Sequence, residues 1–243
     1  MKHAPTPACW ALIPCAGSGT RAGATGPKQY QVLAGQPLVL HTLAAFAAVP
    51  RLRGTGVVVA PDDAVLPSLL PPQPGVRVLP CGGATRAASV FNGLNALLEG
   101  GAQARDWVLV HDAARCLITP ALIDRLIDAC LTDEVGGLLA VPLADTLKTG
   151  FGAGGAARVA QTLARADKWL AQTPQMFRLG HLIEALQSAG DAVTDEASAI
   201  EAQGLSPKLV PGSALNFKVT FPDDFVLAQA VLESRRGRAP EAV

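Results

Sequence analysis

Short apolar runs alternate with helical patterns over the first 140 residues of the chain. The runs CWALIP, GVVVA, VRVLP, WVLVH and GGLLAVP have the length and the continuous hydrophobicity of strands buried on both faces. Between them lie segments whose apolar residues recur at helical spacing, which predict helices over 37–48, 62–70, 86–98 and 120–131. The last helix has clear start signals, with Thr119 as N-cap and Pro120 in the first turn.

This alternation predicts an α/β fold with a mostly parallel, twisted sheet and helices on both faces. No repeat or long linker divides residues 1–243, so we expect a single domain. In such sheets, ligands bind beyond the carboxyl ends of the strands. The loops that follow the apolar runs are therefore where the chemistry is expected.

Residues 143–172 do not continue this alternation of apolar runs and helical segments. The middle of this segment, GFGAGGAAR, is typical of a loose turn, and it is flanked by two stretches that could extend as strands. The result would be a protruding β-arm, which could not bury both of its faces alone and would pack on a partner subunit. A surface insertion without regular structure is the alternative.

Composition excludes several classes of protein. Lys plus Arg equals Asp plus Glu at 20 each, so the chain has no overall basic field for nucleic acid or an anionic membrane. No apolar run reaches the roughly 18 residues that a membrane span requires. The five cysteines are odd in number and include no C-x-x-C pair, which favours reduced thiols in a cytoplasmic protein over disulfides or a zinc site.

The loop after the first apolar run is rich in glycine and cationic. Residues 13–30 read IPCAGSGTRAGATGPKQY, with Arg21 and Lys28 as the charged residues and no carboxylate. The glycine spacing does not fit the dinucleotide fingerprint, and GPKQ lacks the Ser or Thr and the spacing of a Walker motif. The loop could cradle phosphates through its backbone N–H groups, or it could be an ordinary surface loop; alone, it supports both interpretations equally.

Other predicted strand ends favour the phosphate interpretation. They are rich in donors and poor in carboxylates, as a substrate with several phosphates requires. Asp112 follows the run WVLVH, and one carboxylate beside a triphosphate is what Mg²⁺ would use, although Asp112 could also cap the next segment. The remaining candidates at strand ends and in short motifs are Gly82, Gly83, Arg86, Ser89, Arg115, Thr146, Thr173 and Lys218.

The motifs together resemble the 2-C-methyl-D-erythritol 4-phosphate cytidylyltransferases. The resemblance spans roughly residues 11–229 and includes, in the family's order, GGATRAASV, LVHDAAR, VPLADTLK, AQTPQMF, TDEASAIE and NFKVTFPDD. It implies a Rossmann-like nucleotidyltransferase fold whose β-arm exchanges contacts across a homodimer. It also implies that a sugar phosphate attacks the α-phosphorus of CTP, with Mg²⁺ bound and pyrophosphate leaving.

The resemblance also implies functional roles for individual residues. Arg21 and Lys28 match the residues that stabilise the transition state, and Asp112 matches the residue that meets metal and nucleotide. Arg165 and Lys218 match those that hold 2-C-methyl-D-erythritol 4-phosphate, assisted by Thr146, Thr173 and Arg115. The nucleotide-binding positions are Cys15, Ala16, Gly17, Ser18, Gly19, Gly82, Gly83, Ala84, Arg86, Ser89 and Asp112.

Departures from the family's pattern leave two alternatives. Cys15 stands where the family often has Ala, Thr20 where some members have Arg, and Cys116 where Pro usually follows HDAAR. A sibling enzyme that makes CDP-ribitol or another activated polyol shares several blocks. A catalytically inactive nucleotide-binding regulator would share the fold, but retention of Arg21, Lys28, Asp112 and Lys218 argues against it.

Several conspicuous residues have structural explanations. His111 beside Asp112 is typical of a packed strand-end histidine, and the three tryptophans are typical of core or interface positions. In TDEAS, Asp195 and Glu196 fit a helix start with Thr194 as N-cap.

Overall fold

A seven-stranded sheet forms the centre of the protein. The computed structural model describes residues 6–17, 26–70, 75–152, 154–190 and 193–237. The strand order is β11-β7-β10-β6-β1-β4-β5, and only β10 runs antiparallel to its neighbours β6 and β7 within the described sheet. The strands are β1 (Cys9–Pro14), β4 (Leu52–Val58), β5 (Val76–Leu79), β6 (Trp107–Val110), β7 (Gly136–Pro142), β10 (Trp169–Arg178) and β11 (Lys208–Pro211).

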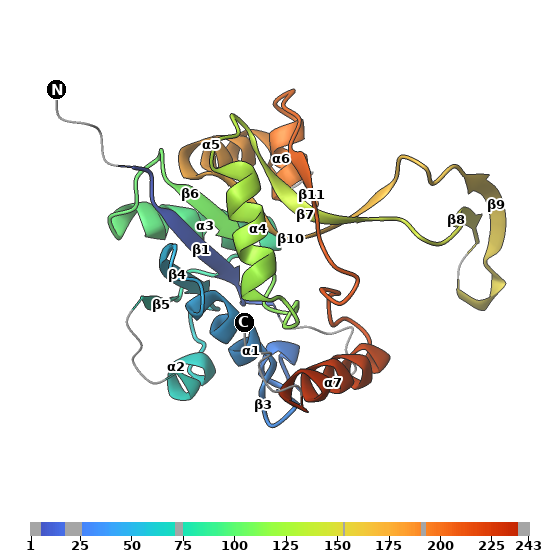
Figure 1. Cartoon of the computed structure of the whole chain (residues 1–243), viewed down its shortest axis with the longest axis horizontal. Coiled ribbons are helices and arrows are strands. Elements are labelled where there is room, and N and C mark those ends of the chain that lie inside the picture. The colour runs from blue at the N-terminus through green and yellow to red at the C-terminus, as the bar shows by residue number, and fades with distance from the viewer. Residues whose placement is uncertain (1–5, 18–25, 71–74, 153, 191–192, 238–243) are drawn as a thin grey trace.

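Helices cover both faces of this sheet (Figure 1). Alternate side chains of each strand enter different cores, as the strand period of two requires. In β1, Ile13 packs into the core under α1 (Leu38–Ala47) and α4 (Pro120–Cys130). Its neighbour Leu12 packs into the opposite core, under α3 (Arg86–Glu99), α5 (Leu179–Ala189) and α6 (Glu196–Glu201). The α/β class expected from the apolar runs is confirmed.

A third, smaller core lies beside the sheet. Helix α7 (Pro222–Gly237) packs there through Ala228 against Leu33 and Leu117. The small elements around it are η2 (Lys28–Tyr30), β2 (Val32–Leu33) and β3 (Gln36–Pro37). This packing joins the chain after the first loop to the segment that carries Lys218.

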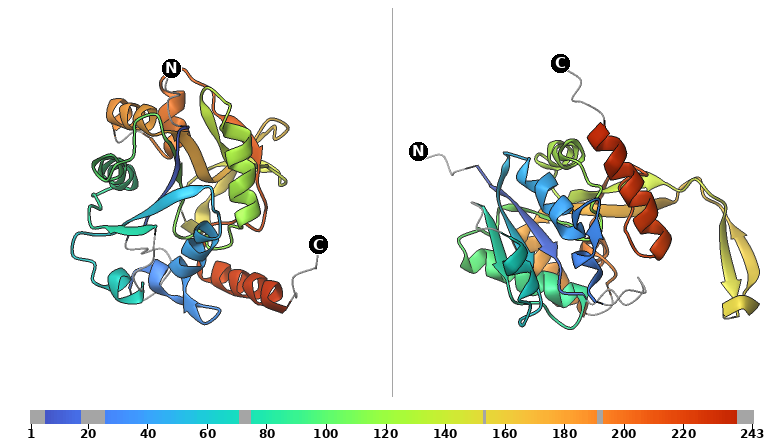
Figure 2. Two further views of the ribbon diagram at one scale, coloured as in Figure 1. Left: turned by 60° about the vertical axis from the view of Figure 1, so that its left-hand side comes forward. Right: turned by 90° about the horizontal axis from the view of Figure 1, so that it is seen from below.

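A two-stranded arm extends away from the sheet (Figures 1 and 2). Strands β8 (Leu147–Phe151) and β9 (Arg158–Leu163) pair antiparallel, and η3 (Gly154–Ala156) lies in their connection. Most of the arm is exposed, including Phe151 and Val159, each 61% exposed. The predicted segment 143–172 thus contains a protruding hairpin, while its last residues, from Trp169, already pair with β7 in the main sheet.

Two differences from the expected elements have physical reasons. The helix expected over 62–70 is the shorter α2 (Val65–Leu69), because the Asp63 carboxylate accepts hydrogen bonds from the N–H groups of Val65 and Leu66 and so sets a later start. Strand β10 was not predicted as one element, since it contains Pro174 and its pairing shifts register there. In the described part of the chain, no helix has both the length and the apolar character needed to cross a bilayer.

Candidate functional site

A cavity of about 470 Å³ opens at the carboxyl ends of the central parallel strands. It brings together three segments that are far apart in sequence: the loop after β1, the start of α3 and the residues after β6, joined by Lys218. The lining residues are Pro14, Cys15, Ala16, Gly17, Lys28, Gln29, Gly83, Ala84, Thr85, Arg86, Ser89, Asp112, Ala113, Ala114 and Lys218. Ten of the predicted site residues are among them.

Gln29, which follows the first loop, is hydrogen-bonded to the start of that loop. Its buried amide Nε2 donates to the carbonyls of Cys15 (2.8 Å) and Gly17 (3.0 Å). Lys28 Nζ donates to the Val219 carbonyl at 2.7 Å, next to Lys218. Burial raises the pKa of the Cys15 thiol to about 12, so this departure from the family's alanine is a neutral, packed side chain.

The second wall is a close-packed glycine segment against α3. The Gly83 N–H donates to Ser89 Oγ (3.0 Å), whose hydroxyl in turn donates to the Thr85 carbonyl (2.9 Å). A Cβ on Gly82 would lie 2.4 Å from the Cβ of Ala16, and a Cβ on Gly83 would lie 2.6 Å from that of Ala88. Glycine is needed at both positions because the backbone approaches its neighbours too closely for any side chain.

Asp112 joins the walls of the cavity electrostatically. Its Oδ1 accepts from Arg86 Nε at 2.8 Å, and its Oδ2 lies 2.7 Å from Lys218 Nζ. Burial alone would raise the pKa of Asp112, but the charges of Arg86 and Lys218 outweigh it and hold this pKa well below its usual range. The carboxylate is therefore ionised and paired at neutral pH.

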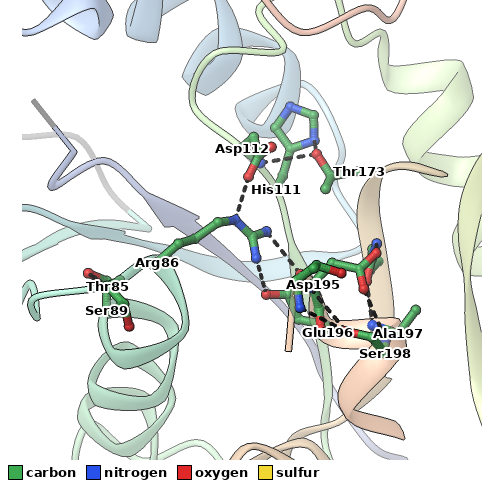
Figure 3. Close-up of polar contacts among 12 residues, drawn as sticks. Thr85, Arg86, Ser89, His111, Asp112, Thr173, Asp195, Glu196, Ala197 and Ser198 are labelled. Carbon is green, nitrogen blue, oxygen red and sulfur yellow. Dashed lines mark hydrogen bonds and ion pairs between the residues drawn. The ribbon is translucent and has the colours of Figure 1, made fainter. Parts of the chain in front are cut away.

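Thr173 and His111 lie beside Asp112 and hold its backbone in place (Figure 3). The Asp112 N–H donates to Thr173 Oγ1 at 3.0 Å, and Thr173 Oγ1 contacts His111 Nδ1 at 3.1 Å. The other ring nitrogen of His111 lies 3.1 Å from the Arg115 carbonyl, which fits a neutral ring protonated at Nε2. Burial lowers the pKa of His111 to about 3, so the ring stays neutral and has the packed role expected from the sequence.

The remaining predicted residues that the structure describes lie outside the cavity lining. Gly82 packs closely against Ala16, which is part of the lining. The Arg115 guanidinium donates to the carbonyls of Asn216 (2.8 Å) and Ala171 (3.1 Å). Thr146 and Arg165 are exposed at the arm, Arg165 in the turn between β9 and β10. Ser18, Gly19 and Arg21 fall outside the described residues, as does Thr20.

Two residues that contact the predicted site residues, Gln29 and Glu196, were not predicted from the sequence. Gln29 follows Lys28 directly, and its proximity to the glycine-rich loop was the available signal. Glu196 is fully buried and forms a paired contact with Arg86 at 2.7 and 3.0 Å. The expected N-cap of its helix was wrong by one residue, because the Asp195 side chain, rather than that of Thr194, accepts the Ser198 N–H.

Comparison with known proteins decides the family. The profile of the 2-C-methyl-D-erythritol 4-phosphate cytidylyltransferases matches residues 9–234. A protein of that name from Laribacter hongkongensis is 58% identical, over 92% of this chain and 96% of its own. The chain belongs to this family. A crystal structure of 4-diphosphocytidyl-2C-methyl-D-erythritol synthase superposes with a TM-score of 0.81 and 40% identity, covering 93% of this chain and 99% of the other.

One relative is a longer protein. The bifunctional enzyme IspD/IspF of Albidiferax ferrireducens is 70% identical over 95% of this chain, which spans about half of that relative's length (54%). The family membership confirms the resemblance drawn from the motifs. It supports a nucleotidyltransferase that uses CTP and 2-C-methyl-D-erythritol 4-phosphate, rather than a CDP-ribitol enzyme or an inactive regulator.

Replacing Gln29 by Met should weaken nucleotide binding. Met has nearly the same length but no donor, so two carbonyls of the first loop lose their shared partner, which costs about 1–3 kcal/mol when such groups are buried. We expect KM for CTP to rise about tenfold in steady-state assays, with KM for the sugar phosphate little changed. Gln31→Met, two residues along the chain, is the control. An unchanged KM for CTP in Gln29→Met would contradict the bracing role.

Proposed function

We propose that the cavity binds CTP across the three strand ends and transfers its cytidylyl group to 2-C-methyl-D-erythritol 4-phosphate. The observation that carries this assignment is the position of Asp112, a paired carboxylate in a cavity whose described lining also holds the cations Lys28, Arg86 and Lys218. Such a lining suits a polyanion with one associated metal ion. Five unpaired cysteines support a cytoplasmic location.

The donor set fits Mg²⁺ bound together with the nucleotide. The described residues include no group of three or more His, Cys, Asp or Glu that could hold a metal ion by themselves. Mg²⁺ commonly takes one or two carboxylates and completes its shell with substrate phosphates and water. Asp112 would supply the protein ligand, and Lys218 would release Oδ2. Once bound, the ion would neutralise charge that develops on the phosphoryl oxygens.

The chain's own groups position the reactants and stabilise charge. The attacking sugar phosphate is mostly dianionic at neutral pH, so it needs no general base. His111 is buried and neutral and has both ring nitrogens engaged, which fits this. We assign to Lys28, with Arg21, the stabilisation of the transferring and leaving phosphates, where fixed cations are most effective. Lys28 is held at the cavity wall by its contact with the Val219 carbonyl.

The cytosine base is assigned to the corner between the first loop and α3. The backbone of Gly83 and Ala84 lines this corner together with Ser89, whose hydroxyl is held by Gly83 and Thr85. Amide N–H and carbonyl groups there can meet the amino group and carbonyl of cytosine. A site built on such hydrogen bonds discriminates strongly, because a wrong base leaves polar groups unpaired.

Pyrophosphate release should therefore depend on both substrates. With 2-C-methyl-D-erythritol 4-phosphate as acceptor, we expect kcat/KM for CTP to exceed that for UTP by at least about a hundredfold. With CTP as donor, ribitol 5-phosphate should be used far more slowly than 2-C-methyl-D-erythritol 4-phosphate. Comparable values for UTP and CTP, or a preference for ribitol 5-phosphate, would contradict the assignment.

The acceptor site is proposed to be shared across a homodimer. The arm exposes Phe151 and Val159, each 61% exposed, and Leu170 in the adjoining start of β10 is 51% exposed; such surfaces are typical of subunit contacts. Arg165 and Thr146 lie at this arm and are absent from the cavity lining of their own chain. We assign them to the cavity of the partner subunit. There, Arg165 would hold the acceptor phosphate with Lys218, while Thr173 and Arg115 hold the surrounding backbone.

Subunit mixing tests this shared site. Lys28→Ala and Arg165→Ala subunits should each form inactive dimers, and they are combined after subunit exchange has been verified. If Arg165 acts on the partner's cavity, each mixed dimer has one site with both lesions and one with neither, so activity returns. If Arg165 acts within its own chain, every site keeps a lesion. A mixture that stays inactive would contradict the assignment of a site shared between subunits.

A further inference from the structure

Glu196 is a buried carboxylate that the proposed reaction does not use. It is the first residue of α6, and its side chain is only 1% exposed. Oε1 accepts from Arg86 Nη1 at 2.7 Å and Oε2 from Nη2 at 3.0 Å, in a paired contact that fixes the guanidinium plane (Figure 3). Glu196 itself does not line the cavity.

The start of α6 holds Glu196 in place. Asp195 caps the helix in a reciprocal arrangement with Ser198. Gln175 on β10 accepts from the Ala197 N–H at 2.7 Å and donates to Asp195 at 2.8 Å. The residues on both sides of Glu196 are thus tied to the central sheet, so its carboxylate is a rigid support for Arg86.

Arg86 transmits this support to the cavity. With one N–H of each Nη group bound to Glu196, Arg86 donates from Nε to Asp112 Oδ1 at 2.8 Å. Lys218 contacts the other oxygen of Asp112, which completes a row of alternating charges, Glu196, Arg86, Asp112 and Lys218. Formal charges along this row sum to zero.

We propose that Glu196 is a positioning residue that tunes Asp112 for the divalent cation by holding Arg86 and sharing its charge. Without the Glu196 carboxylate, Arg86 could turn two N–H groups onto Asp112 and cover it. Its positive charge would also act on one carboxylate instead of two. Both changes make Asp112 a poorer metal ligand. The inference rests on the proposed role of Asp112 in the metal–nucleotide complex.

A purely structural role accounts less well for this arrangement. A buried ion pair contributes little net stability, because desolvation of both charges offsets their attraction. By contrast, partners that hold a metal-ligating group are worth about 10–100-fold in metal affinity or activity. Glu196 acts on the proposed metal ligand Asp112 through one intervening side chain, because it holds Arg86 and Arg86 contacts Asp112.

The test measures CTP binding by calorimetry on the full-length protein, once with EDTA and once with saturating MgCl₂. The readout is the factor by which Mg²⁺ tightens CTP binding. Glu196→Gln should reduce this factor about tenfold or more. In EDTA, CTP should bind as well as to the wild type or more tightly, since a negative charge near the anion is lost. A loosened structure would instead weaken binding in both buffers.

Matched variants separate the possible outcomes. Glu201→Gln makes the same charge change at an exposed position of α6 and should keep the wild-type factor. Asp112→Asn should remove the Mg²⁺ effect; if it does not, the proposed metal role fails. If Asp112→Asn removes the effect and Glu196→Gln keeps the wild-type factor, the inference about Glu196 is overturned and the metal role stands.

Folding is monitored by thermal unfolding of each variant. Should Glu196→Gln not fold, Glu196→Asp decides the question, because it keeps the buried charge but is too short to hold both Nη groups. Its Mg²⁺ factor is expected between those of Glu196→Gln and the wild type. An unchanged factor in Glu196→Asp would overturn the inference.

Discussion

The site depends on one carboxylate that the fold takes out of water and pairs with two cations. Removing Asp112 from water is costly unless its charge is compensated, and Arg86 and Lys218 provide that compensation from opposite sides. One cation begins helix α3, and the other lies in the segment before α7, so this single group connects two distant parts of the chain at the cavity. The backbone at Asp112 is held in turn by Thr173 on β10.

The sheet topology explains why these groups can meet. Strands β1 and β6 are parallel neighbours, so the loops that follow them lie at the same edge of the sheet. Strand β10 runs the opposite way beside β6, so Thr173, in the first half of β10, lies at this edge of the sheet and accepts from the Asp112 N–H. The same strand binds the start of α6 through Gln175, and the row from Glu196 to Lys218 depends on it.

Local patterns allowed the central elements and the cavity's loops to be predicted, because burial on both faces produces continuous apolar runs and strand ends attract donor-rich sequence. The contact of Glu196 with Arg86 joins residues 110 positions apart, and no local pattern encodes such a pairing. The supporting roles of Thr173 and Arg115 also required the tertiary structure, since their contacts are with backbone groups of distant segments. Motif order supplied the family and, through it, roles that geometry alone does not assign.

The central claim is that Asp112 exchanges a lysine for a metal ion when the nucleotide binds. A crystal structure with CTP and Mn²⁺, in which the anomalous signal locates the metal, tests this directly. The account predicts a Mn²⁺ peak at bonding distance from an Asp112 oxygen and from the phosphates, with Lys218 moved off that carboxylate and Arg86 still held by Glu196. A metal peak away from Asp112, with the Lys218 contact intact, would contradict it.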